Sequence, residues 1–200
     1  MKKIIAVLII ILFPVLCLAG SLQKKQCSVI ERKNAVVTCE TETTPSDMKT
    51  SASAYQVVAN ASSVKYVSSA FVGDATSGTV CKVCVTLTKI LSPTMTFTVA
   101  IWSDDGSGPP SKPLAELNNF GGMSSADITG EHCFTTGSVA IANATKYHVV
   151  IASSATDASN YFRWTKDSSA VTTLTNRSAD GASWTALETD RCYMTKLYKQ

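Results

Sequence analysis

Charged residues are scarce in this chain, and the motifs of common enzyme sites are missing from it. Asp, Glu, Lys and Arg make up 16% of the 200 residues, with a formal net charge of +3. Histidine occurs twice, at His132 and His148, and no segment reads Gly-x-Ser-x-Gly, His-Glu-x-x-His or a phosphate-binding loop. The low charge disfavours nucleic-acid partners. We therefore expect a protein that is not an enzyme and does not bind nucleic acid.

Long apolar runs are also missing, except at the N-terminus. Lys2 and Lys3 precede an unbroken apolar run over residues 4–13, and Cys17-Leu18-Ala19 places small residues before a cleavage point. This pattern predicts a signal peptide over residues 1–20 and a secreted or extracytoplasmic mature chain. The apolar segment is shorter than the roughly 20 residues that span a bilayer, so we expect no stable membrane span in the mature form. An uncleaved anchor and a lipoprotein acylated at Cys17 are the alternatives.

Beyond the predicted signal peptide, the cysteines predict a disulfide-linked protein. The six remaining cysteines are Cys27, Cys39, Cys81, Cys84, Cys133 and Cys192. An even number in an exported chain favours three bridges, although 15 connectivities are possible. We predict a bridge from Cys27 to Cys39, because few apolar residues hold that segment in place, and pairing of the other four among themselves.

The spacing of Cys81 and Cys84 also permits two other chemistries. A Cys-x-x-Cys pair can exchange disulfides, but active pairs lie at helix N-termini and this segment has the pattern of a strand. Zinc could be bound by Cys81, Cys84, His132 and Cys133, which requires reduced thiols. An oxidising compartment opposes reduced thiols, so structural disulfides remain our prediction.

The sequence after residue 50 has the pattern of an all-β domain. Short apolar runs alternate with Gly, Pro, Asn, Asp and Ser clusters, and no segment has a helical period. In residues 94–102, alternation places Phe97 and Ile101 on one face, with Met95 and Val99, and Trp102 on the other. In residues 80–91 it places Cys81 and Cys84 on opposite faces. Further strands are predicted at 66–72, 133–135, 146–152, 161–165 and 192–198, and turns at 73–74, 103–113, 121–122, 157–160 and 180–181.

This pattern predicts one antiparallel β-sandwich over residues 51–200, of the jelly-roll or immunoglobulin-like kind. Residues 21–50 carry many charges and few apolar residues. They are expected to form a lead segment or a small hairpin.

Three segments carry motifs that are similar to those of one family. They are residues 101–109 followed by Leu114, residues 144–151, and residues 178–184 preceded by Trp164. Through them residues 50–198 resemble the choice-of-anchor R domain, a module of bacterial and archaeal surface or secreted proteins. The resemblance implies a β-sandwich and brings no catalytic residues. Pro110 and His148 depart from the family pattern, as do the six cysteines.

Aromatic and acidic residues near strand ends are the candidates for ligand binding, because sugar rings stack on flat aromatic side chains. The candidates are Trp102, Asp104, Asp105, Tyr161, Trp164 and Trp184. The competing interpretation is that Trp164 and Trp184 close the hydrophobic core. Asp104, Asp105 and Asp180 could also bind Ca²⁺, but their spacing matches no known calcium loop, so no cofactor is expected.

These observations predict a secreted or cell-surface, non-catalytic module that binds an extracellular glycan or cell-surface polymer. A structural envelope or matrix component that associates through strand edges is the alternative. A secreted hydrolase using Asp104, Asp105 or Glu131, or a thiol oxidoreductase, comes third.

Overall fold

The computed structural model describes residues 38–43, 54–75, 78–106, 113–124, 129–135, 137–166, 175–188, 193 and 195–200. They all belong to the unit Val36–Gln200. The predicted signal peptide, Cys27 and Cys192 lie outside the described residues. Within the described part, no helix is long and apolar enough to cross a bilayer.

The described residues form an all-β structure with one short 3-10 helix, η1 (Ser62–Val64). The strands are β1 (Thr41–Glu42), β2 (Ala54–Val58), β3 (Tyr66–Val72), β4 (Thr79–Ile90), β5 (Thr96–Asp104), β6 (Pro113–Ser124), β7 (Thr129–Phe134), β8 (Val139–Ala140), β9 (Lys146–Ser153), β10 (Tyr161–Lys166), β11 (Thr175–Ser178), β12 (Thr185–Glu188) and β13 (Thr195–Lys199).

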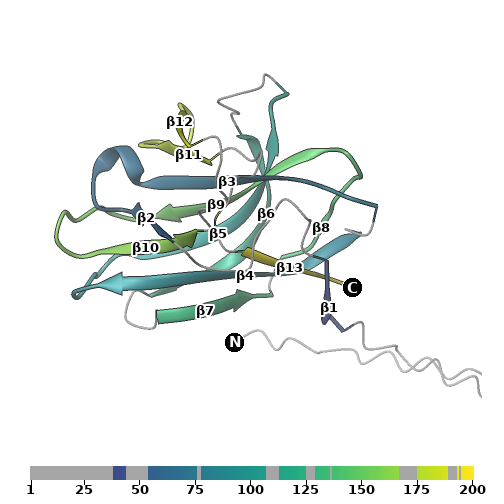
Figure 1. Cartoon of the computed structure of the whole chain (residues 1–200), viewed down its shortest axis with the longest axis horizontal. Coiled ribbons are helices and arrows are strands. Elements are labelled where there is room, and N and C mark those ends of the chain that lie inside the picture. The colour runs from purple at the N-terminus through teal and green to yellow at the C-terminus, as the bar shows by residue number, and fades with distance from the viewer. Residues whose placement is uncertain are drawn as a thin grey trace, which may run out of the picture. The chain divides into compact units, whose positions relative to one another are not determined.

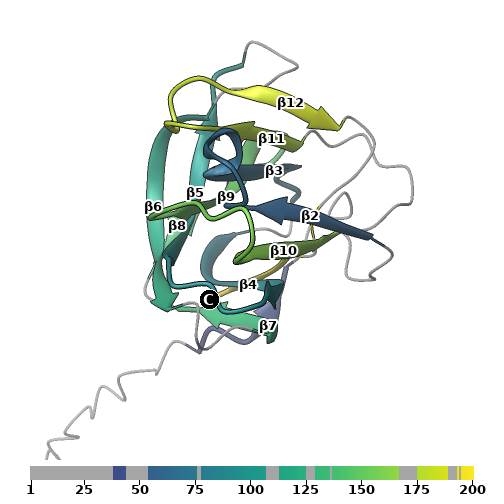
Figure 2. The same cartoon turned by 90° about the vertical axis from the view of Figure 1, so that its left-hand side faces the viewer.

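The strands form two antiparallel sheets (Figure 1). Sheet A has the order β1-β13-β4-β10-β2, and both β7 and β8 pair with β4. Sheet B has the order β12-β11-β3-β9-β5-β6. Figure 2 shows β12 and β11 beside β3, at one end of sheet B. Thr41 and Glu42, within the predicted lead segment, join sheet A by pairing with β13.

The pairing pattern is that of a chain folded back on itself. Strand β5 pairs with β6, β4 with β7, β3 with β9 and β2 with β10. Successive pairs alternate between the two sheets, so the ribbon of paired strands winds around a common core.

The core lies between the inner faces of the two sheets. Phe97 of sheet B contacts Phe134 and Phe162 of sheet A edge-on, with ring centroids 6.2 and 5.4 Å apart. Met95, Phe97, Val99 and Ile101 all belong to the buried cluster, whereas Thr96 and Thr98 are exposed. The predicted alternation in this segment is therefore confirmed. Each such large apolar side chain contributes about 1.5–3 kcal/mol by leaving water.

The Gly121-Gly122 pair was expected to form a turn, and this prediction is wrong because both residues lie inside β6. Val99 faces Gly121 and Ala100 faces Asn119, so Phe120 is an extra residue in a bulge, and its side chain is fully buried. Gly121 has φ 125°, which favours glycine. A Cβ on Gly122 would lie 2.7 Å from the Phe97 carbonyl oxygen. These glycines serve a bulge and a close strand approach.

The predicted Cys27–Cys39 bridge is wrong, because Cys39 is bonded to Cys81. The pairing of β1 with β13, the neighbour of β4, brings Cys39 next to Cys81, with Cα atoms 5.9 Å apart. Cys84 and Cys133 face each other directly on β4 and β7 and form the second bridge.

Strand β4 is irregular near Cys81. In a regular strand Val80 and Val83 would lie on opposite faces, because they are three positions apart, yet both lie in the core. A register shift beside Cys81 explains this, so the predicted alternation fails there.

Candidate functional site

The outer face of sheet B carries the candidate site. Because Val67, Val99 and Ile151 point into the core, residues one position away point outward. The register places Tyr66, Ala152 and Thr98 side by side across β3, β9 and β5. The next two rows on this face contain Val150 beside Ala100, and His148 beside Trp102. Three strands therefore converge on one surface.

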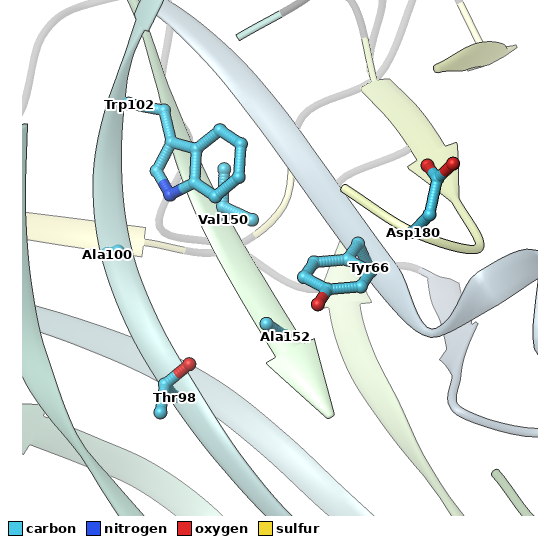
Figure 3. Close-up of a pocket in the computed structure, with 7 residues that line it drawn as sticks. All are labelled: Tyr66, Thr98, Ala100, Trp102, Val150, Ala152 and Asp180. Carbon is cyan, nitrogen blue, oxygen red and sulfur yellow. The ribbon is translucent and has the colours of Figure 1, made fainter. Parts of the chain in front are cut away.

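A pocket of about 220 Å³ opens on this face (Figure 3). Its lining residues are Tyr66, Thr98, Ala100, Trp102, Val150, Ala152 and Asp180. Figure 3 shows the Trp102 and Tyr66 rings on either side of Val150, with Asp180 beyond Tyr66. The small side chains of Ala100 and Ala152 leave room between larger ones. The pocket thus has an apolar floor, aromatic walls and one carboxylate.

Trp184 holds the aromatic walls in place. Its ring lies edge-on to Trp102, at 5.9 Å and 77°, and to Tyr66, at 6.5 Å and 72°. Its indole N–H donates to the Gly181 carbonyl oxygen at 2.9 Å. Edge-to-face aromatic pairs contribute about 0.5–1.5 kcal/mol each beyond their buried area. We call Tyr66, Trp102 and Trp184 the aromatic cluster; its contacts position the rings before any ligand arrives.

The turn between β11 and β12 brings Asp180 to the pocket. Its Oδ1 accepts hydrogen bonds from the backbone N–H groups of Ala182 and Ser183, at 2.8 and 2.9 Å, and from the Ser178 hydroxyl at 2.9 Å. The hydrogen bonds from the backbone of Ser183 and Ala182, followed by the one from the Ser178 hydroxyl, lower the pKa of Asp180 to about 2. The carboxylate is therefore ionised at neutral pH.

Gly181 packs this turn against the aromatic cluster. Its φ of 75° favours glycine, and a Cβ there would lie 3.2 Å from the Tyr66 ring. The segment forms a hairpin turn between the paired strands β11 and β12. A larger residue at this position would strain the backbone and push the turn from Tyr66.

A buried acid–histidine pair lies beside the pocket. The Asp104 Oδ2 atom is 2.8 Å from Nε2 of His148 and 3.9 Å from Nζ of Lys146, and the Asp104 Oδ1 atom accepts from the Gly106 N–H at 2.7 Å. Burial lowers the pKa of His148, and the hydrogen bond to Asp104 opposes this shift without overcoming it. The neutral ring donates from Nε2, and among the residues that the structure describes the buried Nδ1 has no hydrogen-bond partner.

His148 lies beneath the pocket and is fully buried. Its side chain is 0% exposed, so it does not reach the space inside the pocket. It lies directly opposite Trp102 in the β5–β9 register. The Asp104–His148 pair therefore stabilises sheet B beneath the Trp102 wall of the pocket.

The structure brings some of the predicted binding residues together and separates others. Trp102 lines the pocket, and the Trp184 ring contacts the Trp102 ring. Asp104 instead pairs with the buried His148. Asp105 is half-buried directly after β5. Tyr161 begins β10 in sheet A and is not among the residues that line this pocket.

Trp164 does not lie in the pocket, so its prediction as a binding residue is wrong. Its side chain is fully buried in the core and its ring centroid lies 4.4 Å from that of Tyr193. The interpretation of Trp164 as a core residue is confirmed. Trp184, by contrast, is half-buried and belongs to the aromatic cluster.

Sequence reasoning missed Tyr66 and Val150 as site residues. Both lie in segments that were predicted as strands, and alternation alone indicates their outward direction. Their proximity to Trp102 depends on the pairing of β3 and β5 with β9, which residues far apart in the chain determine. No local motif signals it.

The metal and redox alternatives for the cysteines do not fit this structure. Cys81, Cys84 and Cys133 are all in disulfides, so none can serve as a zinc thiolate. Cys81 and Cys84 are not bonded to each other, which excludes a Cys-x-x-Cys redox disulfide. Among the described residues, the group of potential metal ligands that lie close together is Cys84, Glu131 and Cys133, two of which form a bridge.

The pocket offers rings, hydroxyls and a carboxylate for binding. Its seven lining residues contain neither a histidine nor a cysteine. Comparisons with protein-family models, with curated proteins and with solved structures found no match. Function is therefore inferred from the geometry of the pocket.

Proposed function

We propose that this chain is an exported, non-catalytic β-sandwich module that binds glycans in the pocket on the outer face of sheet B. The observation that carries the proposal is the aromatic cluster, in which Trp184 holds Trp102 and Tyr66 at the walls of the pocket. Flat aromatic surfaces suit the C–H faces of sugars, and a few polar groups orient the hydroxyls. Asp180, Thr98 and Tyr66 supply those polar groups.

The size of the pocket supports a ligand of one sugar unit. Its 220 Å³ is below the roughly 300–1,000 Å³ of pockets that enclose drug-sized molecules. One ring would lie on the floor of Ala100, Val150 and Ala152. Further units of a chain would extend into solvent.

The order of the strands supports a jelly-roll type of sandwich. Winding a folded-back ribbon gives the interleaved orders β2-β10-β4-β7 and β3-β9-β5-β6, which the observed pairs match. Jelly rolls include lectin domains, which is an analogy of fold and not evidence about this site. The predicted signal peptide and the resemblance to the choice-of-anchor R domain belong to the same proposal of an extracytoplasmic surface module.

A glycan array probed with the mature chain tests the proposal. We expect specific binding that Trp102→Ala abolishes and Trp184→Ala weakens at least tenfold, because the second variant leaves the Trp102 and Tyr66 rings without their support. Tyr161→Ala is the matched control, since it removes a half-buried aromatic residue from sheet A. Equal loss in all three variants, or no binding by the folded wild type, would contradict the proposal.

A structural envelope component that binds no small ligand is the second candidate. Within the described residues sheet B ends at β6, a strand of 12 residues and hence a long surface for pairing with another chain. Concentration-dependent assembly in analytical ultracentrifugation, together with a blank glycan array, would favour this candidate.

A further inference from the structure

We infer that the pocket binds a cationic sugar, namely a glycan unit whose free amino group is protonated. This inference rests on the proposed function, because it names the charge of the sugar that the same pocket takes. Asp180 is the one charged side chain among the seven residues that line the pocket. A ligand with a positive charge would be attracted to this carboxylate, whereas a neutral sugar would gain no charge attraction from it.

The fixed orientation of the Asp180 carboxylate suits binding of an ammonium group. All three of its hydrogen bonds from turn residues go to Oδ1, which fixes the side chain. Oδ2 accepts no hydrogen bond from the residues that the structure describes. An oriented, ionised carboxylate with one available oxygen forms a strong charge-assisted hydrogen bond with an N–H donor, and little side-chain freedom is lost on binding.

The aromatic walls favour the same charge. Ring faces attract cations within about 6 Å of the centroid, and Trp102 and Tyr66 line the same pocket as Asp180. The indole N–H of Trp184 is used by Gly181, so this ring holds the walls in place and donates nothing to a ligand.

An N-acetylated sugar is the competing ligand. Its methyl group could lie on the apolar floor of Ala100, Val150 and Ala152, and it carries no charge for Asp180. The two sugars differ by one acetyl group, so a matched pair of oligomers separates them.

Calorimetric titration with glucosamine oligomers and with N-acetylglucosamine oligomers of equal length tests the inference. We expect the mature wild-type chain to bind the amine form more tightly. Asp180→Asn should lower affinity for the amine form on the order of tenfold and leave that for the acetylated form nearly unchanged, because one charge-assisted bond is lost. Asn keeps an Oδ1 acceptor, so the turn is retained.

Asp157→Asn is the matched control. The Asp157 Oδ1 atom accepts from the backbone N–H groups of Ser159 and Asn160 in another loop, which is the same arrangement without a place in the pocket. This variant makes the same change in charge and should bind both oligomers as the wild type does. An equal loss with Asp157→Asn, or no change with Asp180→Asn, would overturn the inference.

The wild-type titrations separate this inference from the proposed function. Binding of the acetylated oligomer alone, lost in Trp102→Ala, would overturn the cationic ligand and keep the glycan-binding pocket. If neither oligomer binds and the glycan array is blank, both fail. Should Asp180→Asn not fold, the ratio of the two wild-type affinities decides.

Discussion

The outer face of sheet A is crossed by covalent and ionic links, whereas the outer face of sheet B carries a pocket between aromatic rings. On sheet A, Cys84 is bonded to Cys133, and the Lys196 and Glu131 side chains meet at 2.7 Å across β4. On sheet B, Ala100 and Ala152 separate larger side chains and leave space. Neighbouring side chains on the outer face of a sheet can thus either link the strands or leave room for a ligand. We therefore expect stability and binding to separate by face.

Loss of the Cys84–Cys133 bridge should have the largest effect on stability. The bridge closes a loop with a sequence separation of 49 residues, and its removal frees the unfolded chain. We expect the double variant Cys84→Ala, Cys133→Ala to lose about 3 kcal/mol in free energy of unfolding, measured by urea denaturation without reductant. Glycan binding well below the unfolding midpoint should persist. A stable double variant that no longer binds would break the separation of the two faces.

Asp104→Ala should have the next largest effect, this time from sheet B. The substitution leaves the buried His148 without its Nε2 partner, and a buried polar group without a hydrogen bond destabilises by about 1–3 kcal/mol. Asp104→Asn, which keeps an acceptor, is the conservative control and should lose less. Thermal unfolding at pH 7 measures both. Equal stability of wild type and Asp104→Ala would show that the pair adds nothing to sheet B.

The fold was partly predictable because the local sequence pattern is enough to identify some of the strands. Alternation identified the buried face of β5, since Phe97, Val99 and Ile101 repeat with period two, and β3 was predicted from its short apolar run. Strand β6 was missed because its Pro113, Asn and Gly residues disfavour strands in isolation. Its pairing with β5 overrides that preference, and bulges absorb the irregular residues.

The site was less predictable because it depends on contacts between distant segments. Alternation placed Trp102 on the outer face, which the pocket confirms. The register of β3, β9 and β5 determines which residues lie beside Trp102. Asp180 belongs to a turn that lies 78 positions after Trp102 in the sequence. The predicted Cys27–Cys39 pairing was wrong for the same reason, since Cys39 meets Cys81 through the pairing of β1 with β13.

The buried His148 predicts how the stability of sheet B depends on pH. Burial lowers its pKa below 6.5 in the folded chain, so the unfolded chain binds more protons as the pH falls below about 6.5. The free energy of unfolding should therefore decrease from pH 7 toward pH 5.5 and be flat above pH 7. His148→Gln should show a smaller slope, whatever its absolute stability. Urea denaturation at several pH values between 5.5 and 8 measures it; identical slopes would contradict the assignment.

The smallest effect should come from the ion pair on sheet A. The Lys196 and Glu131 side chains are 29% and 39% exposed, so solvent screens their attraction, although the hydrogen bond that Lys196 donates to Glu131 raises the pKa of Lys196. A double-mutant cycle with Lys196→Met and Glu131→Gln should give a coupling energy below about 1 kcal/mol, reduced further at 1 M salt. The raised pKa means that this coupling is present at neutral pH and is lost as the pH rises through the folded pKa of Lys196. A coupling that matched the disulfide and resisted salt would mean that charge, as well as the covalent bridge, holds β7 and β13 on β4.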